Sequence, residues 1–542
     1  MKRYDLIERA RRYWDNLADF RRERDRCKRY AFGDQWGDRV SVDGRSVTEG
    51  DMIRAEGSTP LKNNLINRFL RNVMGVYRSQ GKEPTCIARD EAEIPLAETM
   101  STVMQCNWQL NKMNELLAAV MKEFLISGAA IVRKSWGTRN GRTDCWTDIV
   151  NPQMFFVDDS MRDIRGWDTT TVGEIKEMDF ADLVAEFATT PRQIDYLRHL
   201  YPAAGPAASR SFGSAADAVG DFLQPSRPGR CRVVEIWSRE RKPRYLCHDR
   251  RDGTLFKIEA DELEAQVSAP NRRRRRDAEP LIDTVWLLEE VWTYRYLAPD
   301  GTVLREAESP YAHGSHPYVF KFHPFIDGEV HSFVGDIIDQ QRYVNRLITL
   351  YDWMIRASAK GVLLFPQECL PQGWTYEDVA REWTRFNGVL PIRGRTAEMM
   401  PRQVSGSVAN AGLNELINLQ LKFFEDISGV NGALQGKPGF AGMSASLYNQ
   451  QSANSAMSLL DILESFSDFV IDGAYKDLRN IRQYYDPSRI CAISGTHPQR
   501  RFTREQIAAA DFDLAIAETP AVPAYRLLNQ QPNTPNTITD ND

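Results

Sequence analysis

The chain has 542 residues, of which 42% are hydrophobic and 26% are charged, and this length exceeds what one hydrophobic core usually serves. We therefore expect two or more globular domains. The net charge of −5 excludes a protein that holds nucleic acid by wholesale neutralisation of phosphates, although it leaves a DNA partner open. The N-terminus is charged throughout and is not a secretory signal, and the longest uncharged apolar stretch, "FLISGAAIV", is far too short to span a membrane.

The cysteines carry no sign of a disulfide framework. Eight of them are spread along the chain without a Cys-x-x-Cys pair, at positions 27, 86, 106, 145, 231, 247, 369 and 491. This spacing favours reduced, mostly buried thiols in a cytosolic setting.

The first third of the chain reads mainly as helix. Apolar residues recur at helical spacing over residues 1–30, 61–80 and 96–132, and the last of these patterns ends at "SGAAIVRKSW", where a strand begins. The charges of residues 1–30 leave two interpretations open, a solvated helix with ion pairs and a docking surface for an acidic partner. The stretch "WTDIVNPQMFFVDD" then predicts a strand and a turn.

The next part of the chain reads as β-structure interrupted by loops. Residues 201–230 are built from Ala, Ser, Gly and Pro and predict a flexible loop, whereas 230–240 and 284–298 alternate apolar and polar residues as strands do. Between them, "NRRRRRD" at 271–277 predicts an exposed loop tip, because five consecutive arginines repel one another. A solubilising role and contact with an acidic partner or with DNA both stay open for these residues, which are Arg272, Arg273, Arg274, Arg275 and Arg276.

The C-terminal half shows the strongest organisation. Residues 335–359 predict a long amphipathic helix. A compact module follows, with a short apolar strand, a helix that begins near Thr375 and a second strand, "GVLPI", at 388–392. A second amphipathic helix over 409–427 is followed by a glycine-rich loop, and a third helical pattern spans about 444–485 before a polar tail that reads as disordered.

The sequence offers few candidates for catalysis. Four histidines, His313, His316, His323 and His331, crowd into "AHGSHPYVFKFHPFIDGEVH" and allow a zinc site to be considered. Two of them precede proline and the segment reads as extended chain and turns, so histidines with ordinary hydrogen bonds are the simpler interpretation. No Walker loop, dinucleotide fingerprint or nucleophile elbow is present. The stretch "GKPGFAGMS" superficially resembles a phosphate-binding loop, but Pro438 lacks the backbone N–H that such a loop needs to bind a phosphate.

The order of several segments resembles that of the portal proteins of tailed bacteriophages, in the broad podovirus-like branch. The resemblance covers most of residues 25–530. The segments that carry it are "RYAFGDQW" (29–36), "PLKNNLINRFLRNVMGVYRSQ" (60–80), "NPQMFFVDDSMRDIRGWD" (151–168), "GDIIDQQRYVNRLIT" (335–349) and "DISGVNGALQG" (426–436). One motif differs from the family: where relatives have a Ser-Gly motif after the glycine-rich loop, this chain has "GMSASLYNQQ". Many relatives also continue into a long C-terminal region called the crown, and here we expect at most a short one.

The resemblance implies an α+β portal fold with a mixed α/β wing, a long helical stem, a small α/β clip and a short C-terminal crown region. It implies the following division: an N-terminal helical part of the wing (1–150), a β-rich wing (151–334), stem helix 1 (335–359), the clip (360–392), a return segment with stem helix 2 (393–428), a tunnel loop (429–446), a long wing or crown helix (447–510) and a C-terminal segment with a disordered tail (511–542).

The resemblance also implies a function without catalysis or cofactors. Such proteins form a ring, typically of twelve subunits, around a DNA channel at one capsid vertex. The partners implied are double-stranded DNA, which is bound independently of its sequence, the terminase large subunit, neck or tail adaptor proteins and the major capsid protein. No contact with a membrane is implied. The protein would be assembled in the host cytoplasm and end in the virion.

The residues implied are, in the tunnel loop, Asn431, Gln435, Lys437, Phe440 and Met443, and in the stem, Asp339, Gln340, Asn345, Arg346 and Arg356. Two alternatives stay open: another structural virion or assembly protein, in which 335–427 is only a helical hairpin with an insert, and a metal-dependent nuclease or hydrolase that uses the histidines of 313–331.

Overall fold

The chain folds into two compact units. The computed structural model describes residues 3–516 except for 43, 80–82, 203–221, 226, 228, 278, 361, 385–388, 394–399, 405–411, 431–456 and 496–501. Unit 1 comprises residues 1–27, 72–333 and 439–542, and unit 2 comprises residues 28–71 and 334–438. Helices and strands contribute to both units, so the predicted α+β class is confirmed.

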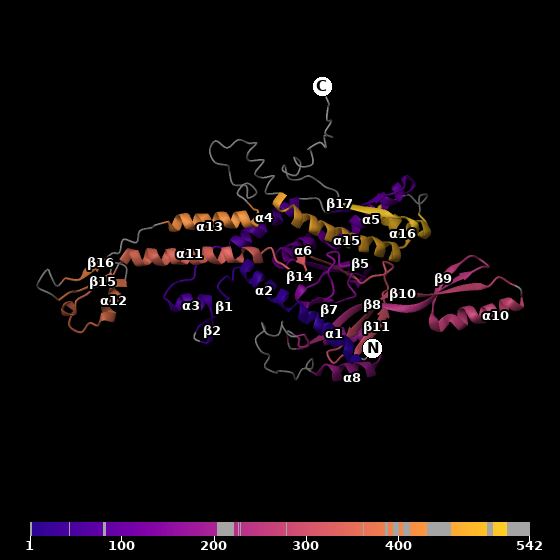
Figure 1. Cartoon of the computed structure of the whole chain (residues 1–542), viewed down its shortest axis with the longest axis horizontal. Coiled ribbons are helices and arrows are strands. Elements are labelled where there is room, and N and C mark those ends of the chain that lie inside the picture. Colours follow the sequence, from indigo (N-terminus) through magenta and orange to yellow (C-terminus); the bar gives the residue numbers. More distant parts are fainter. Residues whose placement is uncertain are drawn as a thin grey trace, which may run out of the picture. The chain divides into compact units, whose positions relative to one another are not determined.

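Unit 1 contains an antiparallel sheet in the strand order β11-β10-β8-β7-β6, with β9 paired to β8. Its strands are β6 (Phe155–Val157), β7 (Thr171–Asp179), β8 (Arg230–Asp249), β9 (Leu255–Glu259), β10 (Ile282–Leu297) and β11 (Val303–Glu308). Strands β8 and β10 pair from Leu297 opposite Val234 to Ile282 opposite Asp249. The alternation read from both segments thus confirms the two predicted strands, which form one long ribbon (Figure 1).

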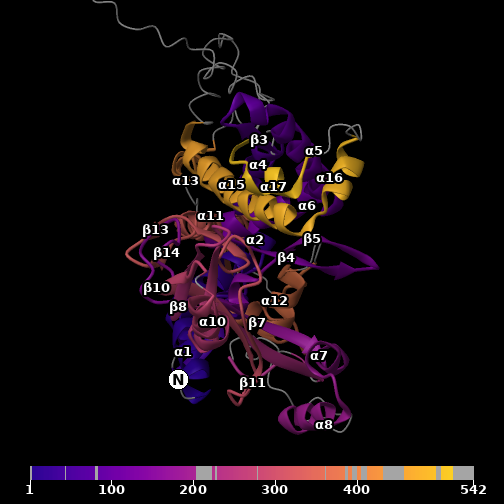
Figure 2. The same cartoon turned by 90° about the vertical axis from the view of Figure 1, so that its right-hand side faces the viewer.

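A helical layer of unit 1 joins segments from both ends of the chain. It consists of α5 (Ile94–Leu110), α6 (Met113–Ser127), α15 (Leu460–Tyr484), α16 (Pro487–Ser494) and α17 (Arg504–Ala509), with β3 (Pro84–Ala88) paired to β17 (Phe512–Ile516). Met100 and Val103 of α5 pack in one core with Leu478 and Ile481 of α15. Figure 2 shows α15 among α5, α16 and α17.

Smaller elements complete unit 1. They are α1 (Arg3–Asn16), α7 (Phe180–Phe187), α8 (Pro191–Leu200), α10 (Ala269–Arg276), β4 (Ala129–Arg139), β5 (Arg142–Ile149), β12 (Tyr318–Phe322), β13 (Phe325–Ile326) and β14 (Glu329–Val330). Strand β4 lies between β12 and β5 in a three-stranded sheet.

Unit 2 is built on two helices that run side by side, α11 and α13 (Figure 1). Its elements are β1 (Arg39–Val42), β2 (Arg45–Thr48), α3 (Glu49–Ala55), α11 (Gly335–Lys360), β15 (Val362–Leu364), α12 (Tyr376–Thr384), β16 (Arg402–Val404) and α13 (Leu413–Ser428). Two of the four boundaries between the units fall within α2 (Ala18–Phe32) and α4 (Leu65–Ser79). The helices predicted over 335–359 and 409–427, and the helix beginning near Thr375, are confirmed.

The predicted division of the chain stays a prediction, and the compact units do not follow its order. It kept residues 28–71 with the rest of the first 150 residues, whereas these residues belong to the same unit as α11 and α13. Periodicity along the chain cannot show this, because the association depends on contacts between segments almost three hundred positions apart.

The arginine run is a helix and not the predicted loop tip. Helix α10 extends through Arg276, with four arginines in its last turn. Two of the like charges are offset by acidic side chains, since Arg272 pairs with Glu264 and Arg274 binds Asp249 at 2.6 Å. Arginine is a good helix former, and positive charge at a helix C-terminus is favourable, so repulsion within the run does not decide its conformation.

The second strand of the module between α11 and α13 was also predicted wrongly. The described part of 388–392 is not a strand, and β15 pairs instead with β16, so that Val362 lies opposite Val404. Pro391 explains why 388–392 does not form a strand, because proline has no N–H to donate to a β-ladder.

Several predictions fall outside the described residues. These are most of the loop over 201–230, the glycine-rich loop from 431 onward, the start of the third helical pattern up to 456, and the tail beyond 516. All eight cysteines are described and free, and seven are buried, which confirms the prediction of buried thiols.

Candidate functional site

Helix α11 carries three buried polar side chains at a spacing of four residues, which we call the polar stripe: Gln341, Asn345 and Thr349. Residues four apart lie on one face of an α-helix. Burying amide and hydroxyl groups is unfavourable unless each finds a hydrogen-bond partner. The polar stripe meets these partners in the backbone of residues 61–66 and in Gln35.

The side chain of Gln341 caps helix α4. Its Oε1 accepts hydrogen bonds from the backbone N–H groups of Leu65 at 2.8 Å and Ile66 at 3.3 Å. Its Nε2 donates to the carbonyl oxygen of Asn63 at 2.7 Å. The first N–H groups of a helix have no partner within the helix; Asn64 caps the N–H of Asn67 locally at 3.0 Å, and the side chain of Gln341 satisfies the two N–H groups before it.

Asn345 is the centre of this network. Its Oδ1 accepts hydrogen bonds from the backbone N–H of Asn63 and from Nε2 of Gln341, both at 3.0 Å. Its Nδ2 donates to Oε1 of Gln35 at 2.7 Å, and Gln35 in turn donates to the carbonyl oxygen of Tyr30 at 3.2 Å. One amide therefore joins α11, the segment before α4 and the loop after α2.

The third residue of the polar stripe holds the backbone of Leu61. The Leu61 N–H donates to Oγ1 of Thr349 at 3.2 Å, while the Leu61 carbonyl accepts from Nε1 of Trp36 at 3.0 Å. An extended segment next to a helix has no ladder of its own, so these side chains satisfy its backbone groups.

Ion pairs connect helix α3 to α11, on the face next to the polar stripe. Glu49 is only 3% exposed at the start of α3, where a negative charge is favoured by the helix dipole. Arg342 and Arg346 both donate to Oε1 of Glu49, the latter at 2.9 Å. Although burial alone would lower the pKa of Arg342, Tyr30 and Glu49 raise the pKa above its ordinary value, so Arg342 stays charged.

The network brings together three of the segments on which the resemblance rests, 29–36, 60–80 and 335–349. A scan against protein-family models matches residues 7–531 to the phage P22-like portal protein family. The chain belongs to that family. No individual curated protein is similar enough to be matched to it.

The portal family places this protein among structural components of the virion, at the head-to-tail connection of a bacteriophage. In the part of the chain that the structure describes, no helix is both long and apolar enough to cross a membrane.

The stem residues predicted for this portal protein have different surroundings. Asp339 is exposed, Gln340 is half-buried and Asn345 is the buried centre of the network. Arg346 is about half exposed and bound to Glu49. Arg356 lies on α11, and its side chain is outside the described atoms.

Sequence reasoning missed five members of the network: Gln35, Glu49, Gln341, Arg342 and Thr349. The spacing of four between Gln341, Asn345 and Thr349 was a usable signal, because polar residues in register on an otherwise amphipathic helix indicate a buried polar contact. Glu49 carried no such signal, since an acidic residue at a helix start is ordinary.

The tunnel-loop residues predicted for the portal protein lie outside the described residues; they are Asn431, Gln435, Lys437, Phe440 and Met443. Helix α13 ends before them at Gly429, whose φ of 67° is the left-handed conformation that ends many helices.

The four histidines predicted as an alternative metal site have individual surroundings. His323 lies 2.9 Å from Oδ2 of Asp461, and His313 accepts a hydrogen bond from the N–H of Ser315 at 3.2 Å. His316 is buried against Trp292, and His331 is exposed. Among the described residues no group of three or more His, Cys, Asp or Glu could hold a metal ion, so the metal-dependent alternative finds no support in them.

Proposed function

We propose that the protein is one subunit of a ring-shaped DNA conduit at a single vertex of the phage capsid, through which the genome is packaged, retained and ejected. The observation that carries this proposal is the match to the P22-like portal family over residues 7–531. Twelve subunits is the number that the family resemblance implies. Assembly would take place in the host cytoplasm.

In this proposal, α11 and α13 form the stem and the module between them forms the clip. Two helices that run side by side, with a small α/β module between them in the chain, support the assignment. The clip would dock the terminase large subunit during packaging and neck or tail adaptor proteins afterwards. Unit 1 would be the wing that meets the major capsid protein.

Contact with DNA would be weak and independent of sequence. The candidate loop offers amides at Asn431 and Gln435 and a cation at Lys437, and the chain as a whole carries a mild charge of −5. Neutralising many phosphates would make binding tight and strongly salt-dependent, which would slow a moving duplex. We propose no catalytic step for this chain, and ATP hydrolysis would belong to a separate motor protein.

Shortening the loop tests this proposal. Deletion of residues 432–442 is expected to leave ring assembly intact, as seen by mass photometry and negative-stain imaging, and to reduce the nuclease-protected DNA per particle at least tenfold in a complementation assay. The reason is that the proposed loop contacts the duplex and makes no contribution to contacts between subunits.

A deletion of similar length elsewhere is the control. Removing residues 206–216, from the Ala- and Ser-rich stretch of unit 1, is expected to change neither assembly nor the amount of protected DNA. Normal packaging by the 432–442 deletion would contradict the proposed role of the loop, and a wild-type protein that never forms a ring would contradict the conduit itself.

A further inference from the structure

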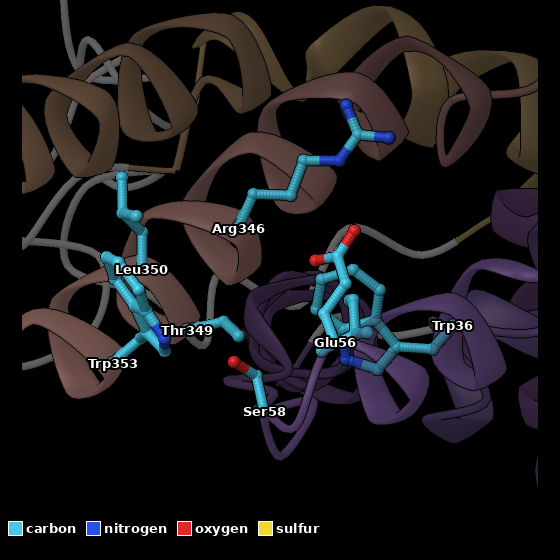
Figure 3. Close-up of a pocket in the computed structure, with 8 residues that line it drawn as sticks. Trp36, Glu56, Ser58, Arg346, Thr349, Leu350 and Trp353 are labelled. Atoms are coloured by element: carbon cyan, nitrogen blue, oxygen red, sulfur yellow. The ribbon is translucent and has the colours of Figure 1, made fainter. Parts of the chain in front are cut away.

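Unit 2 contains a pocket of about 360 Å³ between helix α3 and helix α11 (Figure 3). Trp36 and Ile53 line one side, and Leu350 and Trp353 of α11 line the other. Leu350 is 46% exposed and Trp353 is 51% exposed, so this concave apolar surface is open to solvent among the described residues. An exposed hollow of this composition is typical of a binding site.

Charged side chains stand on both walls of the α3–α11 pocket. Glu56 comes from the end of α3 and Arg346 from α11, and Figure 3 shows both beside the apolar lining. Arg346 also binds Glu49, which fixes its position without consuming all of its donors. A matching ligand would therefore present an apolar group flanked by charges of both signs.

Helix α13 presents a convex surface of this kind. Leu419, Phe423 and Ile427 recur every four residues on one face and are 44%, 41% and 51% exposed. Large apolar residues in one exposed row are unusual for a surface that stays in water. Lys422 and Asp426 lie next to this row, which we call the α13 stripe, and are exposed as well.

We propose that the α13 stripe of one copy of this chain seats in the α3–α11 pocket of the neighbouring copy. The inference rests on the proposed ring, because a ring of identical subunits requires two different, complementary surfaces on each subunit. The pocket and the stripe are such a pair: one is concave, the other is convex, and both are apolar. Phe423 would enter the pocket beside Trp353, and an aromatic anchor in an apolar pocket is the usual centre of an interface.

The charged residues beside the α13 stripe and beside the α3–α11 pocket are also complementary. Lys422 of one copy would face Glu56 of the next, and Asp426 would face Arg346. These rim charges would select the register of the contact more than its strength. A contact of the α13 stripe with itself would pair two apolar rows but would leave the pocket empty, and it would produce a dimer with two-fold symmetry in place of a ring.

Cross-linking between two differently tagged variants tests the proposal. Phe423→Cys carries one tag and Trp353→Cys the other, and the two are co-expressed and the rings purified. A short bismaleimide is expected to yield a species that carries both tags, whereas rings of either variant alone yield little cross-linked product. The native cysteines interfere little, since seven of the eight are buried.

Asn418→Cys is the matched control, because Asn418 is exposed on α13 but lies away from the α13 stripe. Paired with Trp353→Cys, it is expected to cross-link at least fivefold less than Phe423→Cys. Equal yields, no doubly tagged product from intact rings, or a product from Phe423→Cys alone would each overturn the inference and leave the conduit standing. A wild-type chain that forms no ring would overturn both.

Discussion

The amide of Asn345 joins three stretches of chain that are far apart in the sequence, and it does so in the interior. Its oxygen accepts from Asn63 and Gln341, and its nitrogen donates to Gln35. Replacement by leucine keeps the approximate volume but leaves the buried Oε1 of Gln35 and the part-buried N–H of Asn63 without their partner, and a buried polar group left unpaired costs about 1–3 kcal/mol. Asn345→Leu is therefore expected to lower the free energy of unfolding of unit 2 by about 3 kcal/mol.

Hydrogen exchange of the α11 amides and the urea midpoint of the full chain measure this effect. Asp339→Leu is the control, because Asp339 is exposed on the same helix and substitutions of that kind usually change stability by less than about 0.5 kcal/mol. Similar losses of protection in both variants would show that the network does not hold α11 in place.

His316 is a second buried residue with a measurable consequence. It packs edge-on against Trp292 at 4.8 Å between ring centroids, and burial lowers its pKa well below the ordinary value of 6.5, with the charge of Lys476 acting in the same direction. The folded protein therefore keeps His316 neutral, whereas the unfolded chain takes up a proton as the pH falls below about 6.5. Stability is lost in that range by up to about 1.4 kcal/mol per pH unit from this residue.

The substitution His316→Gln is expected to flatten this part of the pH dependence, measured as the urea midpoint between pH 7.5 and 5. His331→Gln serves as the control, because it removes a histidine whose side chain is exposed in the folded protein. An unchanged slope in His316→Gln would mean that the folded state takes up the same proton.

At the scale of elements, the six-stranded sheet depends on one close approach of backbones. A Cβ at Gly173 in β7 would lie 2.3 Å from the carbonyl oxygen of Glu235 in β8 and 2.3 Å from the ring of Phe156 in β6. Neither the paired backbone nor a fully buried ring can move away easily. Gly173→Ala is expected to lower the free energy of unfolding of unit 1 by about 3 kcal/mol, the upper end of the usual cost of overpacking.

Gly137 in β4 gives the comparison, since nothing lies within 4 Å of the position that a Cβ would take there. Gly137→Ala is expected to be neutral or to stabilise by about 0.5 kcal/mol, because alanine loses less backbone entropy on folding. Urea midpoints of the two variants that shift in the same direction by the same amount would refute the steric explanation.

At the scale of the whole molecule, chain order and compact units do not coincide. Each unit is assembled from separate stretches of sequence, and residues 28–71 share a unit with 334–438. The family match over 7–531 spans both units, so the portal assignment belongs to the whole chain. The proposed ring is likewise a property of whole subunits, and its contacts are proposed in unit 2, where an open pocket and an exposed apolar row occur on the same chain.

The sequence by itself determined the long elements and the family. Helical spacing predicted α11 and α13, alternation predicted β8 and β10, and segments in a characteristic order indicated a portal protein. These signals depend only on neighbouring residues or on the order of segments, so they can be read from a single sequence. The short β16 was missed because Arg402–Val404 is neither an apolar run, as β15 is, nor long enough to show alternation.

Only the tertiary structure decided which distant residues meet. The partners of Gln341 and Asn345 lie near residue 63, and Glu49 binds two arginines almost three hundred positions away. Local composition even misled at Arg274, whose pairing with Asp249 helps a helix to form where repulsion predicted a loop. The physical reason is the same in each case: buried polar and charged groups are stabilised by whichever partner the fold brings within hydrogen-bond distance, and that partner has no fixed spacing along the chain.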